Sequence, residues 1–285
     1  MEHRNYFNLD ISAPIFRILK EEQALWWKTV CNDKELYINI RKDNRINVYY
    51  KGCSVMELEY GPRKGLTAKI SNEYIEEKYH NMIIRTYGRK CSIMNPKDIV
   101  KIIDSIRKQI DKYTKTNNDE NVKELAFQGE EYLRGKYIDS EYAFVYSQPK
   151  HKLIRIDLIS INSDGLIEFI ELKRISDGRL NSKSPIPEIV EQIDWYNKFI
   201  EDYGVEIEEY YKNVQKIMRN LEINNPCIDI DIKGVCPKLR LLFIPYDSQK
   251  WKNIRNGDKK TRIQRIEKIA NLLKEKGVKS NINEV

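Results

Sequence analysis

The chain has 285 residues, of which 41% are hydrophobic and 33% are charged, a composition typical of a folded globular protein. No apolar run approaches the roughly 20 residues of a membrane-spanning helix, and the N-terminus lacks the basic-then-apolar layout of a secretion signal. The five cysteines are scattered and the three histidines lie far apart, which argues against a structural zinc site and a disulfide framework. We therefore expect a cytoplasmic protein with one large domain or two modest ones.

The net charge of +7 is concentrated near the C-terminus. Residues 250–279 contain eleven basic and three acidic residues, a local charge of +8, so the remainder of the chain is close to neutral. A concentrated basic segment suits the binding of nucleic-acid phosphates, although a solvated helix face has the same composition. On the first interpretation, the residues that contact nucleic acid are Lys259, Lys260, Arg262 and Arg265.

The first part of the chain is predicted to be an α/β region that contains a β-meander. Its predicted helices cover residues 14–31 and 96–113, and its predicted strands cover residues 35–41, 45–60 and 66–70. The stretch 114–121 is polar and unpatterned, so we place a domain boundary there, between residues 1–117 and 118–285. The N-terminal region has no readable motif, which leaves target recognition and dimerisation open as its role.

The second part of the chain has the predicted order helix, strand, strand, helix, strand, helix, which describes one α/β domain. These elements cover residues 121–138, 152–161, 166–175, 187–203, 238–246 and 258–276. A further amphipathic stretch continues the fourth element to about residue 221. Residues 228–234 are interpreted as an edge strand or a loop with a solvated face.

Glu171 and Lys173 lie two positions apart in the apolar segment IEFIELKRI, so both side chains point to the same face of the predicted strand. An acidic residue two positions before a lysine also occurs at Glu76, Asp231 and Asp258. The spacing is therefore a chance-level signal in so charged a chain. The residues that surround Glu171 and Lys173 in the fold are needed to tell a surface charge pair from part of a catalytic site.

Asp157 lies inside the apolar strand LIRIDLISI, where a carboxylate is costly unless it is paired or bound to a metal. A three-residue loop at 163–165, with Gly165 in the left-handed conformation, would place Asn162 opposite Leu166. The same register places Asp157 opposite Glu171. Side chains opposite each other on paired strands lie about 5 Å apart. Two carboxylates that close repel each other unless a cation lies between them, and Mg²⁺ prefers such hard oxygen ligands.

The predicted helix at 187–203 opens with Pro187, which suits a helix start. Its residues Gln192 and Tyr196 are four positions apart and therefore share one face. A glutamine at the edge of a buried helix face needs a hydrogen-bond partner. Gln192 is therefore either part of a site or an ordinary polar residue at the boundary of the buried face, with its hydrogen bonds satisfied.

Taken together, Asp157, the triplet Glu171-Leu172-Lys173 and the helix segment from Gln192 to Tyr196 resemble the PD-(D/E)XK nuclease superfamily. The helix segment is similar to the QxxxY helix of the RecB-like branch. The resemblance covers roughly residues 121–276 and rests on three short motifs and the element order. It implies a restriction-endonuclease-like core, with a mixed central sheet flanked by helices.

The resemblance also implies a divalent metal, Mg²⁺ or Mn²⁺ in its place, held by the carboxylates of Asp157 and Glu171 and the carbonyl of Leu172. It implies that Lys173 positions or activates the attacking water. One departure is Ile156, which stands where the superfamily name has proline. Many members of the superfamily lack that proline.

The remaining site residues also follow from the resemblance. Gln192 and Tyr196 are expected at the edge of the site, in contact with the metal shell or the nucleic acid. The first helix of the family usually provides a further glutamate, which is Glu131 or Glu124 here, with Glu131 preferred.

The implied activity is metal-dependent hydrolysis of phosphodiester bonds, with DNA as the expected substrate. The alternative is a non-catalytic nucleic-acid-binding or assembly protein on the same fold. Cleavage of both strands of a duplex would suit a homodimer, but the sequence shows no dimer surface. Trp251 and the segment 48–52 are candidates for stacking on bases, although core packing is the more common use of Tyr49 or Tyr50.

Overall fold

The computed structural model divides the chain into two compact units that are described separately here. The first unit comprises Met1–Ile138 and Tyr210–Asp229, and the second comprises Asp139–Glu209 and Ile230–Val285. Residues 118–138 belong to the first unit, and the predicted domain boundary after residue 117 stays a prediction. The residues that the structure describes are 7–21, 25–87, 90–117, 119–146, 152–174, 177–180, 186–244 and 256–282.

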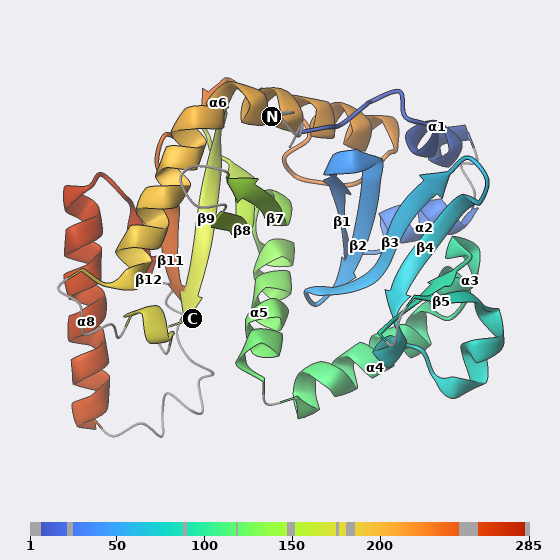
Figure 1. Cartoon of the computed structure of the whole chain (residues 1–285), viewed down its shortest axis with the longest axis horizontal. Coiled ribbons are helices and arrows are strands. Elements are labelled where there is room, and N and C mark those ends of the chain that lie inside the picture. The colour runs from blue at the N-terminus through green and yellow to red at the C-terminus, as the bar shows by residue number, and fades with distance from the viewer. Residues whose placement is uncertain are drawn as a thin grey trace. The chain divides into compact units, whose positions relative to one another are not determined.

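In the described residues, the first unit contains a six-stranded sheet in which every pair of neighbouring strands is antiparallel (Figure 1). The strands, in spatial order, are β1 (Leu36–Arg41), β2 (Arg45–Tyr50), β3 (Cys53–Gly61), β4 (Gly65–Ser71), β6 (Cys91–Met94) and β5 (Ile83–Tyr87). The first four form the predicted meander. The turn between β2 and β3 has Lys51 and Gly52 in the left-handed region, with φ of 48° and 76°. Strands β5 and β6 were not predicted.

The helices of the first unit are shorter than the sequence pattern predicts. They are α1 (Pro14–Glu21), α2 (Leu25–Asn32), α3 (Pro96–Lys101), α4 (Ile103–Thr116) and α5 (Glu120–Arg134). The helix predicted at 96–113 is interrupted at Ile102, whose φ of −109° and ψ of 15° are not helical. Asn95 caps α3 by accepting a hydrogen bond from the Lys97 amide. The helix predicted at 14–31 corresponds to α1 and α2, and residues 22–24 between them lie outside the described residues.

The predicted helix at 121–138 is wrong at its C-terminal end. The helix α5 ends at Arg134, and Tyr137 already begins strand β7 (Tyr137–Tyr146). A Cβ atom on Gly135 would lie 2.0 Å from the Tyr137 ring, so the tight change of direction requires a residue without a side chain. The helix and the strand are therefore joined without a polar loop, so the sequence pattern does not show where the helix ends.

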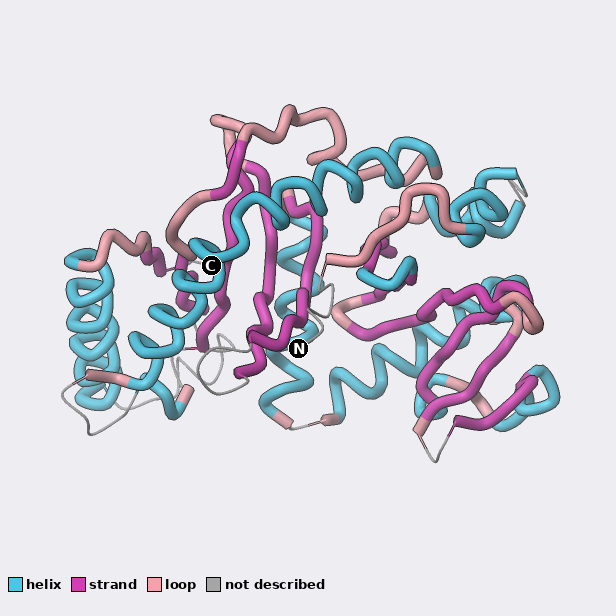
Figure 2. The backbone as a smooth tube through the Cα atoms, turned by 45° about the horizontal axis from the view of Figure 1, so that its top comes forward, coloured by secondary structure: helices cyan, strands magenta, loops and turns pink. Residues whose placement is uncertain are grey.

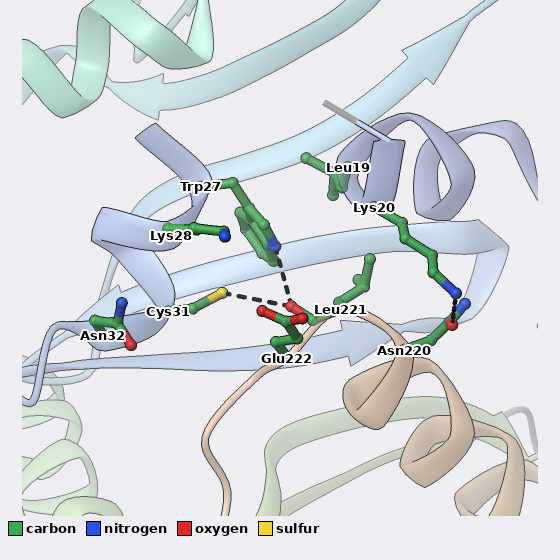
Figure 3. Close-up of a pocket in the computed structure, with 9 residues that line it drawn as sticks. All are labelled: Leu19, Lys20, Trp27, Lys28, Cys31, Asn32, Asn220, Leu221 and Glu222. Atoms are coloured by element: carbon green, nitrogen blue, oxygen red, sulfur yellow. Dashed lines mark hydrogen bonds between the residues drawn. The ribbon is translucent and has the colours of Figure 1, made fainter. Parts of the chain in front are cut away.

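The C-terminal end of helix α6 (Glu188–Asn220) belongs to the first unit and is anchored there by side chains of α1 and α2. The Leu221 carbonyl accepts hydrogen bonds from Trp27 Nε1 at 3.3 Å and from Cys31 Sγ at 3.8 Å (Figure 3). These contacts border a cavity of about 190 Å³. Burial raises the pKa of the Cys31 thiol to about 12, so it stays protonated and unreactive at neutral pH. Side chains that line the cavity therefore anchor the end of α6, because they donate hydrogen bonds to the backbone carbonyl that follows the helix.

The second unit contains a curled mixed sheet with helices (Figure 1, Figure 2). Strand β9 pairs antiparallel with β8 and parallel with β10 and β11, and β11 pairs parallel with β12. In the described residues, the order is β12-β11-β9-β8-β7, with β10 beside β9. These strands are β8 (Lys152–Ile161), β9 (Leu166–Arg174), β10 (Gly234–Val235), β11 (Arg240–Ile244) and β12 (Ser280–Ile282).

Two helices pack on this sheet. The N-terminal part of α6 covers the face to which Glu171 belongs, because Gln192 reaches that side chain. Helix α8 (Asn256–Glu275) lies beside β12, on the side of Glu168 and Arg240, and lines a cleft of about 510 Å³ with them. Helices thus accompany the sheet, and strand β11, which lies between β9 and β12, is buried from Leu241 to Ile244.

Several elements of the second unit differ from the sequence prediction. Strands β7, β10 and β12 were not predicted, whereas the segment 228–233 is a loop, which was one of the two interpretations offered for it. Helix α6 continues through a kink at Tyr203, with φ of −126° and ψ of 18°, to Asn220. None of the described helices is both long and apolar enough to cross a membrane.

Candidate active site

The hairpin of β8 and β9 sets the register of the candidate site. The Asn162 amide donates to the Leu166 carbonyl and the Gly165 amide donates to the Asn162 carbonyl, both at 3.0 Å. Gly165 has a φ of 80°, so the predicted three-residue loop is confirmed. The paired residues run from Ile161 opposite Ile167 to Leu158 opposite Ile170. Continued by one position beyond these pairs, the register would place Asp157 opposite Glu171, which stays a prediction.

Beyond the Leu158–Ile170 pair, side chains of the candidate site form hydrogen bonds with the backbone of β8 and β9. The Leu172 amide donates to Asp157 Oδ2 at 2.7 Å. Two residues before Asp157 on β8, the Tyr196 hydroxyl donates to the Arg155 carbonyl at 2.9 Å and accepts from the Arg155 amide at 3.3 Å. The Leu172 amide and the backbone of Arg155 therefore each form a hydrogen bond with a side chain of the candidate site. The fold of the hairpin end and the geometry of the site depend on each other.

Glu171 and Lys173 form a buried ion pair in which each residue is 2% exposed. Lys173 Nζ donates to Glu171 Oε1 and, at 3.1 Å, to the Leu172 carbonyl. Burial raises the pKa of Glu171, and the nearby Lys173 opposes this shift. Burial by itself would lower the pKa of Lys173, but the charges of Glu171 and Asp157 outweigh it and raise that pKa. Lys173 therefore carries a positive charge at neutral pH.

Gln192 and Tyr196 lie on the helix face that meets this pair, as predicted. Gln192 Nε2 donates to Glu171 Oε1 at 2.8 Å and to the Tyr196 hydroxyl at 2.9 Å. Tyr196 is 4% exposed, and its burial raises the pKa of the hydroxyl, which stays protonated at neutral pH. The helix α6 is thereby connected to both strands of the hairpin through polar side chains.

Asp177 and Arg179 also belong to the cluster, although the sequence analysis did not identify them. They lie in and beside the short turn η4 (Gly178–Leu180), which follows β9. Arg179 Nη1 donates to Gln192 Oε1 at 3.1 Å, while Nε and Nη2 donate to the two carboxylate oxygens of Asp177 at 2.9 and 2.6 Å. The only sequence signal was an Asp-Gly turn with an arginine directly after the strand, which is too short to be specific.

The donor set fits a hard divalent cation. Glu171 Oε2 is buried and has no hydrogen-bond partner among the described residues, which is costly for a carboxylate oxygen unless it has a ligand. Asp157 and the Leu172 carbonyl are the neighbouring oxygens on the same segment of the hairpin. In the part of the chain that the structure describes, no three Asp, Glu, His or Cys side chains form a metal-binding group, so water would complete the coordination shell, as Mg²⁺ prefers.

Glu131 and Glu124 are not placed in this cluster. Both lie on α5, which belongs to the first unit, and Glu131 Oε1 accepts a hydrogen bond from the Tyr137 hydroxyl at 3.1 Å. Either glutamate as a further site carboxylate stays a prediction. Tyr49 and Tyr50 are 4% and 5% exposed, which shows that they pack in the core, and Trp251 lies outside the described residues.

The predicted basic surface lies on α8. Lys260 and Arg265 are exposed and Arg262 is half-buried, whereas the side chain of Lys259 is outside the described part of the structure. The basic residues of the segment 250–255 are also outside the described residues. Helix α8 contacts the turn η4, which carries Arg179.

Comparison with known proteins finds no match to a protein-family model, to a curated protein or to a solved structure.

Proposed function

We propose that this protein is a metal-dependent nuclease that hydrolyses phosphodiester bonds in DNA, on a restriction-endonuclease-like core of the RecB-like branch. One observation carries the proposal. Asp157, Glu171, Lys173, Gln192 and Tyr196 form one connected cluster at the end of the β8–β9 hairpin, and Glu171 Oε2 is buried without a hydrogen-bond partner among the described residues.

The metal in this proposal is Mg²⁺, for which Mn²⁺ can substitute, held by Asp157, Glu171 and the carbonyl of Leu172. When bound, such a cation lowers the pKa of a water molecule and offsets the charge on the phosphate. The same oxygens contact Lys173 or its neighbours in the structure, so their position is already fixed before a substrate binds.

The protein's own residues have distinct roles in the proposed reaction. Lys173 holds a positive charge beside the attacked phosphate, where charge increases in the transition state. Gln192 orients the Glu171 carboxylate, and Tyr196 fixes the end of β8 through the backbone of Arg155. The half-buried Asp157 connects this interior to solvent.

The basic helix supports a polyanionic substrate. Lys260, Arg262 and Arg265 lie on α8, which packs against the turn that carries Arg179. Positive charge next to the site would hold the phosphate backbone without reading its sequence. Lys259 belongs to the same proposed surface by its position in the helix.

The test is to incubate the protein with supercoiled plasmid, linear duplex and single-stranded DNA in Mg²⁺, with RNA in parallel. We expect cleavage of DNA that EDTA abolishes, and a loss of about 100-fold or more in Lys173→Ala, because a preorganised charge at the transition state is removed. Lys78→Ala is the matched control, since Lys78 also follows an acid by two positions but lies in the first unit. Cleavage that persists in EDTA, or that Lys173→Ala leaves unchanged, contradicts the proposal.

The alternative is a non-catalytic nucleic-acid-binding or assembly protein on the same fold. One observation favours it: Glu171 and Lys173 are each 2% exposed, as in a purely structural ion pair. This alternative predicts DNA binding without cleavage, and binding that neither EDTA nor Asp157→Ala changes. The same experiments thus separate the two functions.

A further inference from the structure

The side chain of Arg179 is held by Asp177, its neighbour in the turn after β9, as well as by a residue of the candidate site. The Asp177 carboxylate accepts from the Arg179 amide at 2.8 Å, and the Leu180 amide donates to the Asp177 carbonyl at 3.0 Å. The guanidinium forms a two-pronged contact with the same carboxylate, which fixes its plane as well as its position. The third prong, Nη1, extends to Gln192 Oε1.

The orientation of the Gln192 amide follows from its neighbours. A guanidinium can only donate hydrogen bonds and a carboxylate can only accept them. Arg179 therefore faces the amide oxygen of Gln192, and the amide nitrogen is directed to Glu171 Oε1 and the Tyr196 hydroxyl. A rotated amide would place two donors against each other at Arg179 and two acceptors against each other at Glu171.

The consequence reaches the proposed metal ligand. Glu171 Oε1 accepts from both Gln192 and Lys173, whereas Oε2 has no hydrogen-bond partner among the described residues. The relay from Asp177 through Arg179 and Gln192 thereby determines which oxygen of Glu171 is engaged and which is available. Asp177 offsets the charge of Arg179, so the relay orients Glu171 without a full additional positive charge beside it.

We propose that Arg179 is a positioning residue of this site, which acts through Gln192 to hold the Glu171 carboxylate in the orientation that binds a divalent cation. The proposal deepens the proposed nuclease function and rests on it for the reading of cleavage rates. The affinity for Mn²⁺ can be measured without any cleavage, so the two can fail independently.

The experiment compares Arg179→Met and Arg179→Lys in the full chain, with Mn²⁺ affinity measured by titration calorimetry and kcat and KM measured on a DNA duplex. We expect Arg179→Met to weaken Mn²⁺ binding and to lower kcat by about 10-fold each, within the range of other residues that orient metal ligands, with KM unchanged. Arg179→Lys should not restore either value, because lysine lacks the planar fork. Arg219→Met is the control, since Arg219 is similarly exposed and lies beside an aspartate in the first unit.

A double-mutant cycle tests the route through Gln192. In a Gln192→Ala background, Arg179→Met should cause no further loss of Mn²⁺ affinity, because its target is gone. An unchanged Mn²⁺ affinity in Arg179→Met overturns the proposal, as does a full additional loss in the Gln192→Ala background. A rise in KM at constant kcat overturns it as well, since that result indicates a direct contact with phosphate.

The outcomes also separate this proposal from the proposed function. If the wild-type chain cleaves DNA and Arg179→Met behaves like it, the nuclease stands and the positioning role fails. If the wild-type chain binds Mn²⁺ but cleaves no nucleic acid, the nuclease fails and the Mn²⁺ cycle still decides the role of Arg179. A wild-type chain that binds no Mn²⁺ overturns the positioning role.

Discussion

Two glutamate-lysine pairs with the same spacing lie in the two units of this protein. In the first unit, Lys78 Nζ lies 3.0 Å from Glu76 Oε2, and the two side chains are 61% and 30% exposed. In the second unit, the side chains of Lys173 and Glu171 are each 3% exposed. The first pair is a surface contact at the start of a 3-10 segment, whereas the second is enclosed by a hairpin and a helix. The same three-residue pattern thus produces two different electrostatic environments.

The pKa shifts of the two glutamates show the difference. The hydrogen bond from Ser105, followed by that from Lys78, lowers the pKa of Glu76. Burial raises the pKa of Glu171 in spite of the Lys173 ammonium beside it. A salt bridge in water gains little, while a buried one pays a large desolvation cost and depends on every remaining partner. The position in the fold, and not the motif, therefore decides whether the pair can do chemistry.

The largest expected effect is on stability. Glu171→Ala leaves the Lys173 ammonium buried without its partner, so we expect the free energy of unfolding to fall by about 3–5 kcal/mol. The same substitution at Glu76 should change it little, because that pair is exposed to solvent. Urea denaturation of both variants measures the difference.

The stability cycle has a second arm. Replacing both buried charges, in Glu171→Leu with Lys173→Met, should recover most of the lost stability, because no charge is left unpaired. If the double variant is as unstable as Glu171→Ala, the loss comes from packing and the comparison of the two pairs breaks down.

The next effect concerns metal affinity. Lys173 contacts Glu171 Oε1 and the Leu172 carbonyl, so its ammonium repels a metal ion bound at the other oxygen of Glu171 and competes with that ion for the carbonyl. We expect Lys173→Met to bind Mn²⁺ about tenfold more tightly, a gain of about 1.4 kcal/mol, although it should no longer cleave DNA. Titration calorimetry checks this, with Lys78→Met as the variant that should bind like the wild type. Weaker binding by Lys173→Met would show that the lysine supports the metal rather than competing with it.

The smallest expected effect is on the titration of the carboxylates. Glu171 should titrate above, and Glu76 below, the ordinary pKa of 4.5. The lowered pKa means that Glu76 contributes stability above its unfolded pKa and loses this contribution as pH falls through its folded pKa. For Glu171 the sign is opposite, because the folded state binds its proton more tightly and stability falls as pH rises through its pKa. Carbon-13 NMR of the side-chain carboxyls measures both, and similar pKa values for the two would contradict the contrast.

The parts of the fold that could be predicted from the sequence are those set by local chemistry. The register of the β8–β9 hairpin follows from Gly165 and the length of its loop, and this register, continued by one position, would place Asp157 opposite Glu171. The meander follows from alternating apolar residues and two turns. The spacing of Gln192 and Tyr196 likewise places them on one helix face, because helical geometry repeats every few residues.

The parts that could not be predicted depend on contacts that are distant along the chain. Strand β7 begins at Tyr137, two residues after Gly135, and its first residues look like a continuation of the helix pattern. Arg179 meets Gln192 only because the turn after β9 folds towards α6. The division into units was also hidden, since nothing local marks residues 210–229 as partners of the N-terminal helices.

The return of the α6 end to the first unit has a consequence for the order in which the protein is made. The Leu221 carbonyl is the acceptor for Trp27 and Cys31, yet a ribosome releases it long after these residues and after the whole segment from Asp157 to Tyr196. The first unit can therefore be completed only after the proposed catalytic residues have emerged, and the second unit must wait for residues 230–285. Nascent chains halted before residue 210 should accordingly leave the N-terminal helices without their last partner, because the two units are interleaved along the chain.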